Sequence, residues 1–400
     1  MRHSTGKRPY LADSVTLPDL AVYATFGPNR SRYTPDVTEL LPAASAALGV
    51  QITEPVTLSG SGRSAVVRGR IPGSSTVVVK SYPMDEEGAE GFAAEAAGLE
   101  FTSGTGTGPD LLATDPAERL VVMTDLGDAP SLATLLLSPS AAPASAAFLS
   151  WAVACGRLAA RTAGRDQEFT GILARQQARM GVQPPEEHWL LRRIREIPGL
   201  LGRLSIEAPA GLEYDLAAVA TLLGPGEPLV FSPGDICPDN ALLADGGIRF
   251  IDFEESGYHP VFLDAAYLRM PFSTCWCAFR LPAWLRDAAE ARYRAQVVRI
   301  WPRLADDGTW QRGVRRAVAA WSLNSMWWLL DRALAGDESL EPDAVAAPRA
   351  RQLMRHRWQV LAGELEAGGE FPAIAAMARV LLDATAGWEA DELPLYPALR

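Results

Sequence analysis

Residues 230–257 read VFSPGDICPDNALLADGGIRFIDFEESG, and this stretch decides the fold prediction. It contains two short apolar runs, ALLA and IRFI, separated by an Asp-Gly-Gly sequence that is a strong signal for a hairpin turn. Antiparallel pairing of the two runs places their outer ends, Asn240 and Asp252, side by side. Asp235 lies five residues before Asn240, in the loop that enters the hairpin. The sequence therefore predicts that three oxygen-bearing side chains gather at the open end of one hairpin.

Oxygen groups in this arrangement suit a magnesium site. Mg²⁺ prefers hard oxygen ligands, takes few of them from the protein and completes its shell with water and phosphate. In phosphoryl transfer, such ligands hold the metal against the β- and γ-phosphates, while a separate acid orients the acceptor hydroxyl and takes its proton. Asn240 and Asp252 are the candidate metal ligands, and Asp235 is the candidate acid. The alternative is an ordinary surface loop, because Asp and Asn are common turn residues.

The order and spacing of residues in this stretch resemble those of a known family. Asp-x-x-x-x-Asn, a hairpin and then Ile-Asp-Phe is similar to the kinase set of a catalytic Asp, a metal-binding Asn and a metal-binding Asp. With the preceding Gly and the later Asp264-Ala265-Ala266, it is more similar to the aminoglycoside phosphotransferase and choline kinase superfamily than to protein kinases. The resemblance implies that Asp264 is a structural brace under the catalytic loop. The usual His-Gly-Asp of that superfamily reads Pro233-Gly234-Asp235 here, so the His that helps to hold the loop is missing.

The sequence before this stretch predicts a β-meander. The runs VTL at 56–58, AVVRGRI at 65–71 and TVVVKSY at 76–82 are rich in Val and Ile and are separated by Gly, Ser and Pro. Gly60-Ser61-Gly62 lies between the first two runs, where a hairpin loop can cover the phosphates of a nucleotide. Taken alone, this glycine pattern is more typical of a plain turn.

Lys80 and Glu95 are predicted to form an ion pair. Lys80 ends the apolar run of the third strand, whereas residues 86–102 have a helical period in which Glu95 shares the apolar stripe with Phe92. A buried carboxylate needs a partner, because burying it alone is costly. Lys80 is the natural partner, and kinase-like enzymes need such a Lys–Glu pair. The alternatives are that Glu95 reaches water at the edge of the stripe, or that Glu90 takes its place.

LVVMTDL at 120–126 is predicted to be a strand that leads into a hinge between two lobes. Backbone groups of Thr124 and Leu126 would bind the adenine there. These parts occur in the order expected for kinase-like folds, and the resemblance covers roughly residues 51–270. It implies ATP as the phosphate donor and Mg²⁺ as the metal, with Lys80 on the α- and β-phosphates.

Strands come first along the chain and helices follow, which predicts an α+β fold of two lobes. We expect a bilobal protein-kinase-like fold with a small β-rich N-lobe and a larger, mostly helical C-lobe that ends in a helical C-terminal extension. The expected divisions are an N-terminal extension (1–50), a nucleotide-binding N-lobe (51–126), a C-lobe with the catalytic loop and metal site (127–300) and a helical C-terminal part of the C-lobe (301–400).

Composition limits the partners. The 400-residue chain has 37 Lys plus Arg and 48 Asp plus Glu, a net charge of −11, which disfavours general binding to nucleic acid or to anionic membranes. No secretory signal is apparent, and no stretch reaches the roughly 18 apolar residues of a membrane span. Four unevenly placed cysteines do not make a disulfide framework. We therefore expect a cytoplasmic protein that binds no membrane.

Four further patterns have plain structural interpretations. Cys275-x-Cys277 could start a metal site, but no Cys or His cluster stands near it in the sequence, so core packing beside Trp276 is favoured. His259 is interpreted as a loop residue, with lining of the cleft as the alternative. WSLNSMWW at 321–328 is interpreted as helix core or, alternatively, as an aromatic wall of the acceptor pocket. RQLMRHRW at 351–358 is interpreted as a solvated helix face.

The sequence thus predicts an ATP- and Mg²⁺-dependent phosphotransferase that moves the γ-phosphoryl group to a hydroxyl of a small molecule. The resemblance implies an aminoglycoside, another antibiotic, a sugar or an amino alcohol as the acceptor. Two alternatives stay open: a kinase of Ser or Thr in a peptide, and a pseudokinase that binds nucleotide without turnover. Pro233 motivates the pseudokinase, whereas the joint presence of Asp235, Asn240 and Asp252 argues against it.

Overall fold

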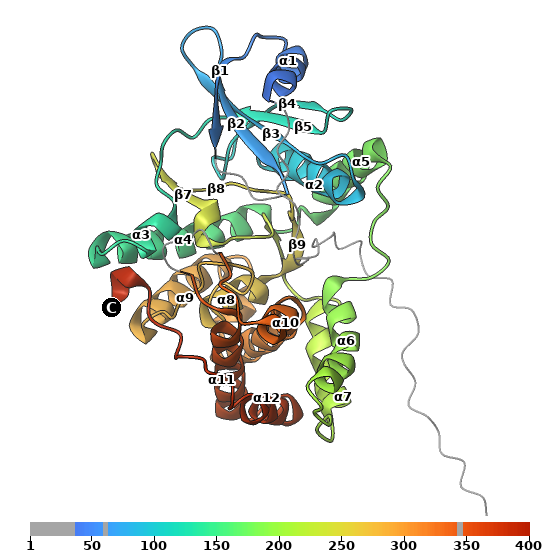
Figure 1. Cartoon of the computed structure of the whole chain (residues 1–400), viewed down its shortest axis with the longest axis vertical. Helices are drawn as coiled ribbons and strands as arrows, with labels where there is room; N and C mark the ends of the chain where they lie inside the picture. The colour runs from blue at the N-terminus through green and yellow to red at the C-terminus, as the bar shows by residue number, and fades with distance from the viewer. Residues whose placement is uncertain (1–36, 59–62, 342–346) are drawn as a thin grey trace, which may run out of the picture.

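The computed structural model describes residues 37–58, 63–341 and 347–400. They form two lobes, a small one built around a five-stranded sheet and a larger one that is mostly helical (Figure 1). This is the expected bilobal kinase-like α+β fold. The predicted phosphate-covering loop, Gly60-Ser61-Gly62, lies outside the described residues.

The sheet of the small lobe is antiparallel and contains the predicted meander. Its order is β1-β2-β3-β5-β4, so the third strand of the meander is central and pairs with the predicted hinge strand. The sequence patterns did not predict β4, an only partly buried edge strand. The strands are β1 (Thr53–Leu58), β2 (Ala65–Arg70), β3 (Thr76–Ser81), β4 (Leu111–Asp115) and β5 (Leu120–Thr124).

The two faces of this sheet pack against different helices. Val79 of β3 packs with Leu40 of α1 (Val37–Leu48) in a small separate core. Val121 of β5, on the other face, belongs to the main core. Because side chains alternate along a strand, Lys80 follows Val79 onto the face of α2 (Glu86–Thr102) and of the larger lobe. Helix α2 has the predicted bounds 86–102.

Residues 230–257 contribute to two short strand pairs, one inside the stretch and one at its ends. The predicted hairpin consists of β7 (Ala241–Ala244) and β8 (Gly247–Phe250), with Ala241 opposite Phe250. A second pair, β6 (Leu229–Ser232) with β9 (Gly257–Pro260), was not predicted. It holds the two ends of the stretch together, so the loop between β6 and β7 is fixed on both sides.

Helices make up the rest of the larger lobe. Among them α5 was not predicted, because few apolar residues mark its buried side; it packs against α2 of the small lobe. The helices are α3 (Leu132–Leu136), α4 (Ala141–Thr162), α5 (Asp166–Met180), α6 (Trp189–Arg203), α7 (Leu212–Ala220), α8 (Val261–Arg269), α9 (Ala283–Val297), α10 (Asp307–Ala335), α11 (Ala350–Gly368) and α12 (Pro372–Ala384). Short 3-10 turns are η1 (Thr221–Leu223), η2 (Pro238–Asn240), η3 (Pro302–Ala305) and η4 (Pro397–Leu399).

The predicted solvated face at 351–358 is wrong. These residues belong to α11, which packs against both α10 and α12 at the end of the larger lobe (Figure 1). A helix between two neighbours buries two of its sides, and Arg357 and Trp358 are each only 1% exposed. Among the described residues, no helix is both long and apolar enough to cross a membrane.

Candidate active site

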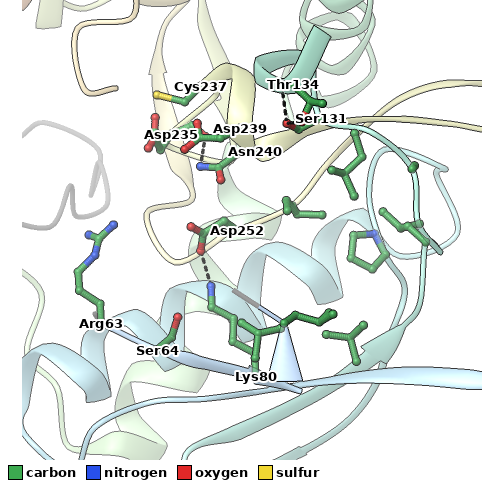
Figure 2. Close-up of a pocket in the computed structure, with 18 of the residues that line it drawn as sticks. Arg63, Ser64, Lys80, Ser131, Thr134, Asp235, Cys237, Asp239, Asn240 and Asp252 are labelled. Carbon is green, nitrogen blue, oxygen red and sulfur yellow. Dashed lines mark hydrogen bonds and ion pairs between the residues drawn. The ribbon is translucent and has the colours of Figure 1, made fainter. Parts of the chain in front are cut away.

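A pocket of about 850 Å³ lies between the two lobes. Lys80 and Glu95 of the small lobe line it together with Asp235, Asn240 and Asp252 of the larger lobe. Figure 2 shows Asp235 and Asn240 on one side of the pocket, with Asp252 and Lys80 facing them. The structure therefore brings together five residues that the sequence analysis selected from separate motifs.

Lys80 is the centre of a buried charge cluster. Its Nζ donates to Glu95 Oε2 at 2.9 Å and also contacts the carboxylate of Asp252. Glu254 Oε2 is 3.1 Å away. The hydroxyl of Tyr82 donates to the same Glu95 oxygen at 3.0 Å. Glu95 is 1% exposed, so it does not reach water, and a buried carboxylate of this kind depends on its cation.

The other predicted partner, Glu90, lies elsewhere. Burial and the neighbouring Glu86 raise the pKa of Glu90, and the cation near it is Arg192. Glu90 is therefore not part of the Lys80 cluster.

The charges of this cluster shift the pKa values of its carboxyl groups. Burial and the neighbouring Glu254 raise the pKa of Asp252 to about 7, although Lys80 opposes the shift. Burial alone would raise the pKa of Glu254, but the positive charges of Lys80 and Arg63 outweigh this effect and lower the pKa to about 2. Arg63 bonds Glu254 and Glu255 at 3.0 Å each. It thus ties the start of β2 to the segment after Asp252.

Asp235 is held by two hydroxyl groups that the sequence analysis missed. Thr274 Oγ1 donates to Asp235 Oδ1 at 2.8 Å, and Tyr267 OH donates to the same oxygen at 3.2 Å. Tyr267 lies on α8 and Thr274 in the loop after it, 32 and 39 residues beyond Asp235. No short motif marks either residue, because only the tertiary fold brings them next to the loop that carries Asp235.

The loop that carries Asp235 is also shaped by its backbone. Gly234 has a φ of +99°, and a Cβ there would lie 2.2 Å from the carbonyl oxygen of Glu255. Only glycine fits such a position. The Gly234 N–H donates to Ser232 Oγ at 3.2 Å, and the side-chain amide of Asn240 donates to the Asp235 carbonyl at 3.1 Å. These contacts fix the loop without using residue 233.

The hairpin brings the backbone of Asn240 next to that of the segment 251–252. The Ile251 N–H donates to the Asn240 carbonyl at 3.0 Å, directly before Asp252. Asp252 has a φ of +67°, a left-handed conformation that turns the chain toward the pocket. The amide nitrogen of Asn240 is engaged with the loop, which leaves the amide oxygen for a ligand. Both side chains line the pocket and offer the hard oxygen atoms that Mg²⁺ prefers, so this donor set fits the metal.

The hinge residues Thr124 and Leu126 also line the pocket. The Thr124 N–H already donates to the carbonyl of Asp110 at 3.0 Å, so this donor is not available to a base. Arg68 Nε contacts the carboxylate of Asp125 at 2.7 Å, which joins β2 to the hinge.

His259 is neither a loop residue nor part of the cleft wall, so that interpretation is wrong. It lies on β9, is 2% exposed and bonds Asp264 Oδ1 at 2.7 Å. Tyr293 OH donates to the other oxygen of Asp264 at 3.3 Å. Asp264 therefore connects α8, β9 and α9 within the core of the larger lobe.

The side of the pocket next to Asp235 is aromatic. Trp276 Nε1 donates to Asp239 Oδ2 at 2.8 Å, and Trp328 Nε1 donates to the Ser273 carbonyl at 3.2 Å. Both tryptophans line the pocket. Trp321, from the same predicted segment as Trp328, is buried in the core instead. The segment 321–328 thus supplies both helix core and pocket wall.

Comparisons with known proteins agree with this architecture. Residues 55–306 match the model of a family described as "Phosphotransferase enzyme family". No curated protein matches the chain.

Several solved structures are similar to the chain. A candidate aminoglycoside phosphotransferase from Ralstonia eutropha has 14% identity and a TM-score of 0.50, with 83% of this chain and 98% of that chain covered. A choline kinase from Cryptosporidium parvum has 15% identity, a TM-score of 0.49 and coverages of 82% and 93%. A macrolide 2′-phosphotransferase from Brachybacterium faecium has 16% identity, a TM-score of 0.48 and coverages of 78% and 99%. At 14% identity, the likeness to the Ralstonia protein shows a shared fold.

Proposed function

The chain belongs to the phosphotransferase enzyme family, and from this premise we propose that it transfers the γ-phosphoryl group of ATP to a hydroxyl of a small molecule in the presence of Mg²⁺. One observation carries the proposal. Lys80, Glu95, Asp235, Asn240 and Asp252 line a single pocket between the lobes. A nucleotide-binding module alone has no need of the acid at Asp235, which disfavours the pseudokinase.

Asp235 is the proposed base. Both hydroxyl contacts to its carboxylate are made to Oδ1, so Oδ2 is available to the acceptor hydroxyl. Thr274 and Tyr267 hold the carboxylate in one orientation, which is the positioning that a general base requires. In this role Asp235 orients the acceptor hydroxyl and takes its proton as the phosphorus–oxygen bond forms.

Asn240 and Asp252 are the proposed metal ligands. Bound Mg²⁺ would neutralise charge on the β- and γ-phosphates. Lys80, held by Glu95 at 2.9 Å, would contact the α- and β-phosphates. Lys80 already contacts Asp252, so the residues proposed to bind metal and phosphate lie together before either ligand arrives.

The acceptor is proposed to be a small molecule such as an aminoglycoside, another antibiotic, a sugar or an amino alcohol. The pocket beside Asp235 has walls from Trp276, from Trp328 and Arg332 of α10, and from Leu340 beyond it. Such walls favour a compact acceptor over an extended peptide. The peptide kinase would be supported instead if a Ser- or Thr-containing peptide were phosphorylated and no small alcohol were.

Calorimetric titration of ATP tests the nucleotide site. We expect binding to the native chain that depends on Mg²⁺ and that Asp252→Ala removes, because the variant lacks a carboxylate ligand. Asp245→Ala is the matched control, since this exposed carboxylate lies at the turn of the same hairpin. Absence of Mg²⁺-dependent binding to the native chain would contradict the proposal, and a screen of small alcohols for phosphorylation then tests the acceptor.

A further inference from the structure

Sulfur atoms gather beside the catalytic loop. Cys237 lies in the loop that carries Asp235, Asp239 lies in the following turn η2, and Cys275 lies in the loop after α8. One ligand atom of each of these three residues lies within 4.8 Å of those of the other two. The Sγ of Cys277 lies 2.8 Å from that of Cys275, and all of these thiols are free.

This cluster changes the interpretation of Cys275-x-Cys277. The sequence analysis favoured core packing, because no further Cys or His stands near that pair in the sequence. In the structure, the missing partners are Cys237 and Asp239. Asp239 lies 36 residues before Cys275 in the sequence. Cys275 Sγ lies 3.6 Å from Asp239 Oδ1. Two segments thus contribute ligand types that zinc sites use, thiolate sulfur and carboxylate oxygen.

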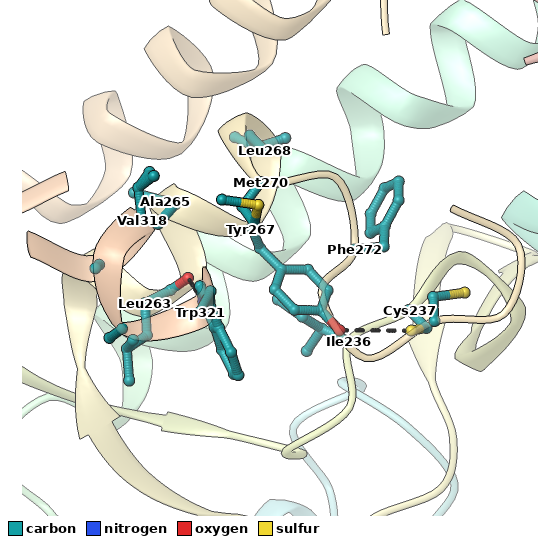
Figure 3. Packing of buried hydrophobic residues seen from close by; sticks show 14 of the residues in the cluster. Ile236, Cys237, Leu263, Ala265, Tyr267, Leu268, Met270, Phe272, Val318 and Trp321 are labelled. Atoms are coloured by element: carbon teal, nitrogen blue, oxygen red, sulfur yellow. Dashed lines mark hydrogen bonds between the residues drawn. The ribbon is translucent and has the colours of Figure 1, made fainter. Parts of the chain in front are cut away.

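The cluster is open to a ligand. Cys237, Asp239 and Cys275 all line the pocket between the lobes, and Figure 2 shows the first two side by side above it. Figure 3 shows the other side of Cys237, where its thiol meets Tyr267 OH at 3.5 Å. An ion that enters the pocket therefore meets this cluster in the pocket wall.

A buried arginine next to the cluster, Arg357, would be stabilised by a nearby negative charge. Arg357 is 1% exposed and donates to Ser325 Oγ at 2.9 Å and to the Phe272 carbonyl at 3.0 Å. Both partners are neutral, and within residues 37–58, 63–341 and 347–400 no carboxylate pairs with this guanidinium. A buried cation without a counterion is costly. The Phe272 carbonyl that accepts from Arg357 also accepts from the backbone N–H of Cys275 at 3.0 Å, which places the guanidinium beside the cluster.

We propose that Cys237, Asp239 and Cys275 bind one thiophilic divalent cation, Zn²⁺ by its chemistry, with the fourth position open to the pocket. Two thiols lose their protons to solvent on binding, so the ligands carry three negative charges and the ion two positive charges. The loaded site then has a net charge of 2 − 3 = −1, which balances Arg357. Thiolate sulfur distinguishes this site from the hard oxygen ligands proposed for Mg²⁺.

Cobalt titration tests the site, because Co²⁺ bound to thiolates absorbs light in the near ultraviolet. The reduced, metal-free full chain is titrated with Co²⁺ without nucleotide, and Zn²⁺ is then added. We expect one Co²⁺ per chain with a thiolate-to-cobalt band, which one equivalent of Zn²⁺ removes. Cys237→Ala and Cys275→Ala should each weaken binding by more than about 100-fold, beyond the loss caused by removing an outer-shell partner.

Cys155→Ala is the matched control. Cys155 is also a buried free thiol, but it lies on α4, and its variant should keep the band. The proposal is overturned if the native chain shows no thiolate band, or if Cys155→Ala removes it while Cys237→Ala does not.

A second measurement does not depend on the folding of variants. The native chain is alkylated with and without Zn²⁺, and the modified cysteines are located by mass spectrometry. We expect Zn²⁺ to slow modification of Cys237 and Cys275 and to leave Cys155 unaffected. Equal rates at Cys237 and Cys275 in both conditions would overturn the proposal.

Discussion

The two sides of the pocket are held in opposite ways. On one side, Asp252 belongs to a buried cluster of ions around Lys80 that includes Glu95 and Glu254. On the other side, Asp235 is held by the neutral hydroxyl groups of Thr274 and Tyr267. The ionic side can exchange one charged partner for another, as phosphate and metal binding require. The neutral side fixes one carboxylate in place, as proton transfer requires.

The largest effect is expected on the neutral side. Asp235→Asn keeps the shape of the side chain but removes its ability to accept a proton. General bases contribute about 10²- to 10⁴-fold to rate, so kcat should fall by that factor. ATP affinity should change little, because Asp235 is not among the groups proposed to hold the nucleotide or its metal. Steady-state kinetics together with calorimetry checks both parts, and a normal kcat would remove Asp235 from the mechanism.

On the ionic side of the pocket, Lys80→Met is expected to cause the largest loss of stability. The variant leaves the buried carboxylate of Glu95 without its cation, whereas Glu254 keeps Arg63. Removing one partner of a buried pair costs about 3–5 kcal/mol, which urea unfolding would show as a lower free energy of unfolding. Arg70→Met is the control, because Arg70 pairs with Glu54 on the exposed face of β2. That surface pair should contribute no more than about 1 kcal/mol.

A smaller effect on the neutral side of the pocket is expected from substitution of Thr274. Thr274→Val removes the hydroxyl that donates to Asp235 at 2.8 Å, and a hydrogen bond to a charged group contributes about 1.5–3 kcal/mol. We expect kcat to fall about 10- to 100-fold while the KM for ATP stays near its native value. Thr274→Ser restores the donor and should restore kcat. If Val and Ser variants behave alike, the hydroxyl does not position Asp235.

The same contrast explains what the sequence predicted. Lys80 and Glu95 were found because a carboxylate on an apolar stripe requires a cation, and both lie in elements with clear periods. Asn240 and Asp252 were correctly placed at the open end of one hairpin because a strong turn signal fixes its register. The fold class followed from these parts and their order along the chain.

No comparable sequence pattern marks the residues on the neutral side of the pocket. Thr274 and Tyr267 carry no charge whose burial would demand a partner, and they lie 39 and 32 residues from Asp235. Cys275 meets Asp239 across a similar separation. Arg357 was misinterpreted because its burial comes from helices on two sides of α11, which its own sequence does not record. Long-range contacts that no local sequence pattern marks are therefore what the sequence left unpredicted.

A final prediction uses pH to separate the two sides. The pKa of Asp252 is about 7 because burial and Glu254 disfavour its charged form. A metal ion needs the carboxylate, so metal-dependent ATP binding must displace a proton below that pH. We expect the affinity of the native chain for ATP with Mg²⁺ to fall about tenfold per pH unit below 7 and to level off above it.

Asp252→Asn provides the control for this pH dependence. ATP itself gains a proton near pH 6, but that change affects the native chain and the variant alike, so the ratio of their affinities isolates Asp252. The ratio should be large at pH 8 and shrink toward one as the pH falls, since protonation makes the native side chain resemble an amide. A ratio that stays constant from pH 6 to 8 would mean that Asp252 is ionised throughout, and that Lys80 rather than burial controls this side of the pocket.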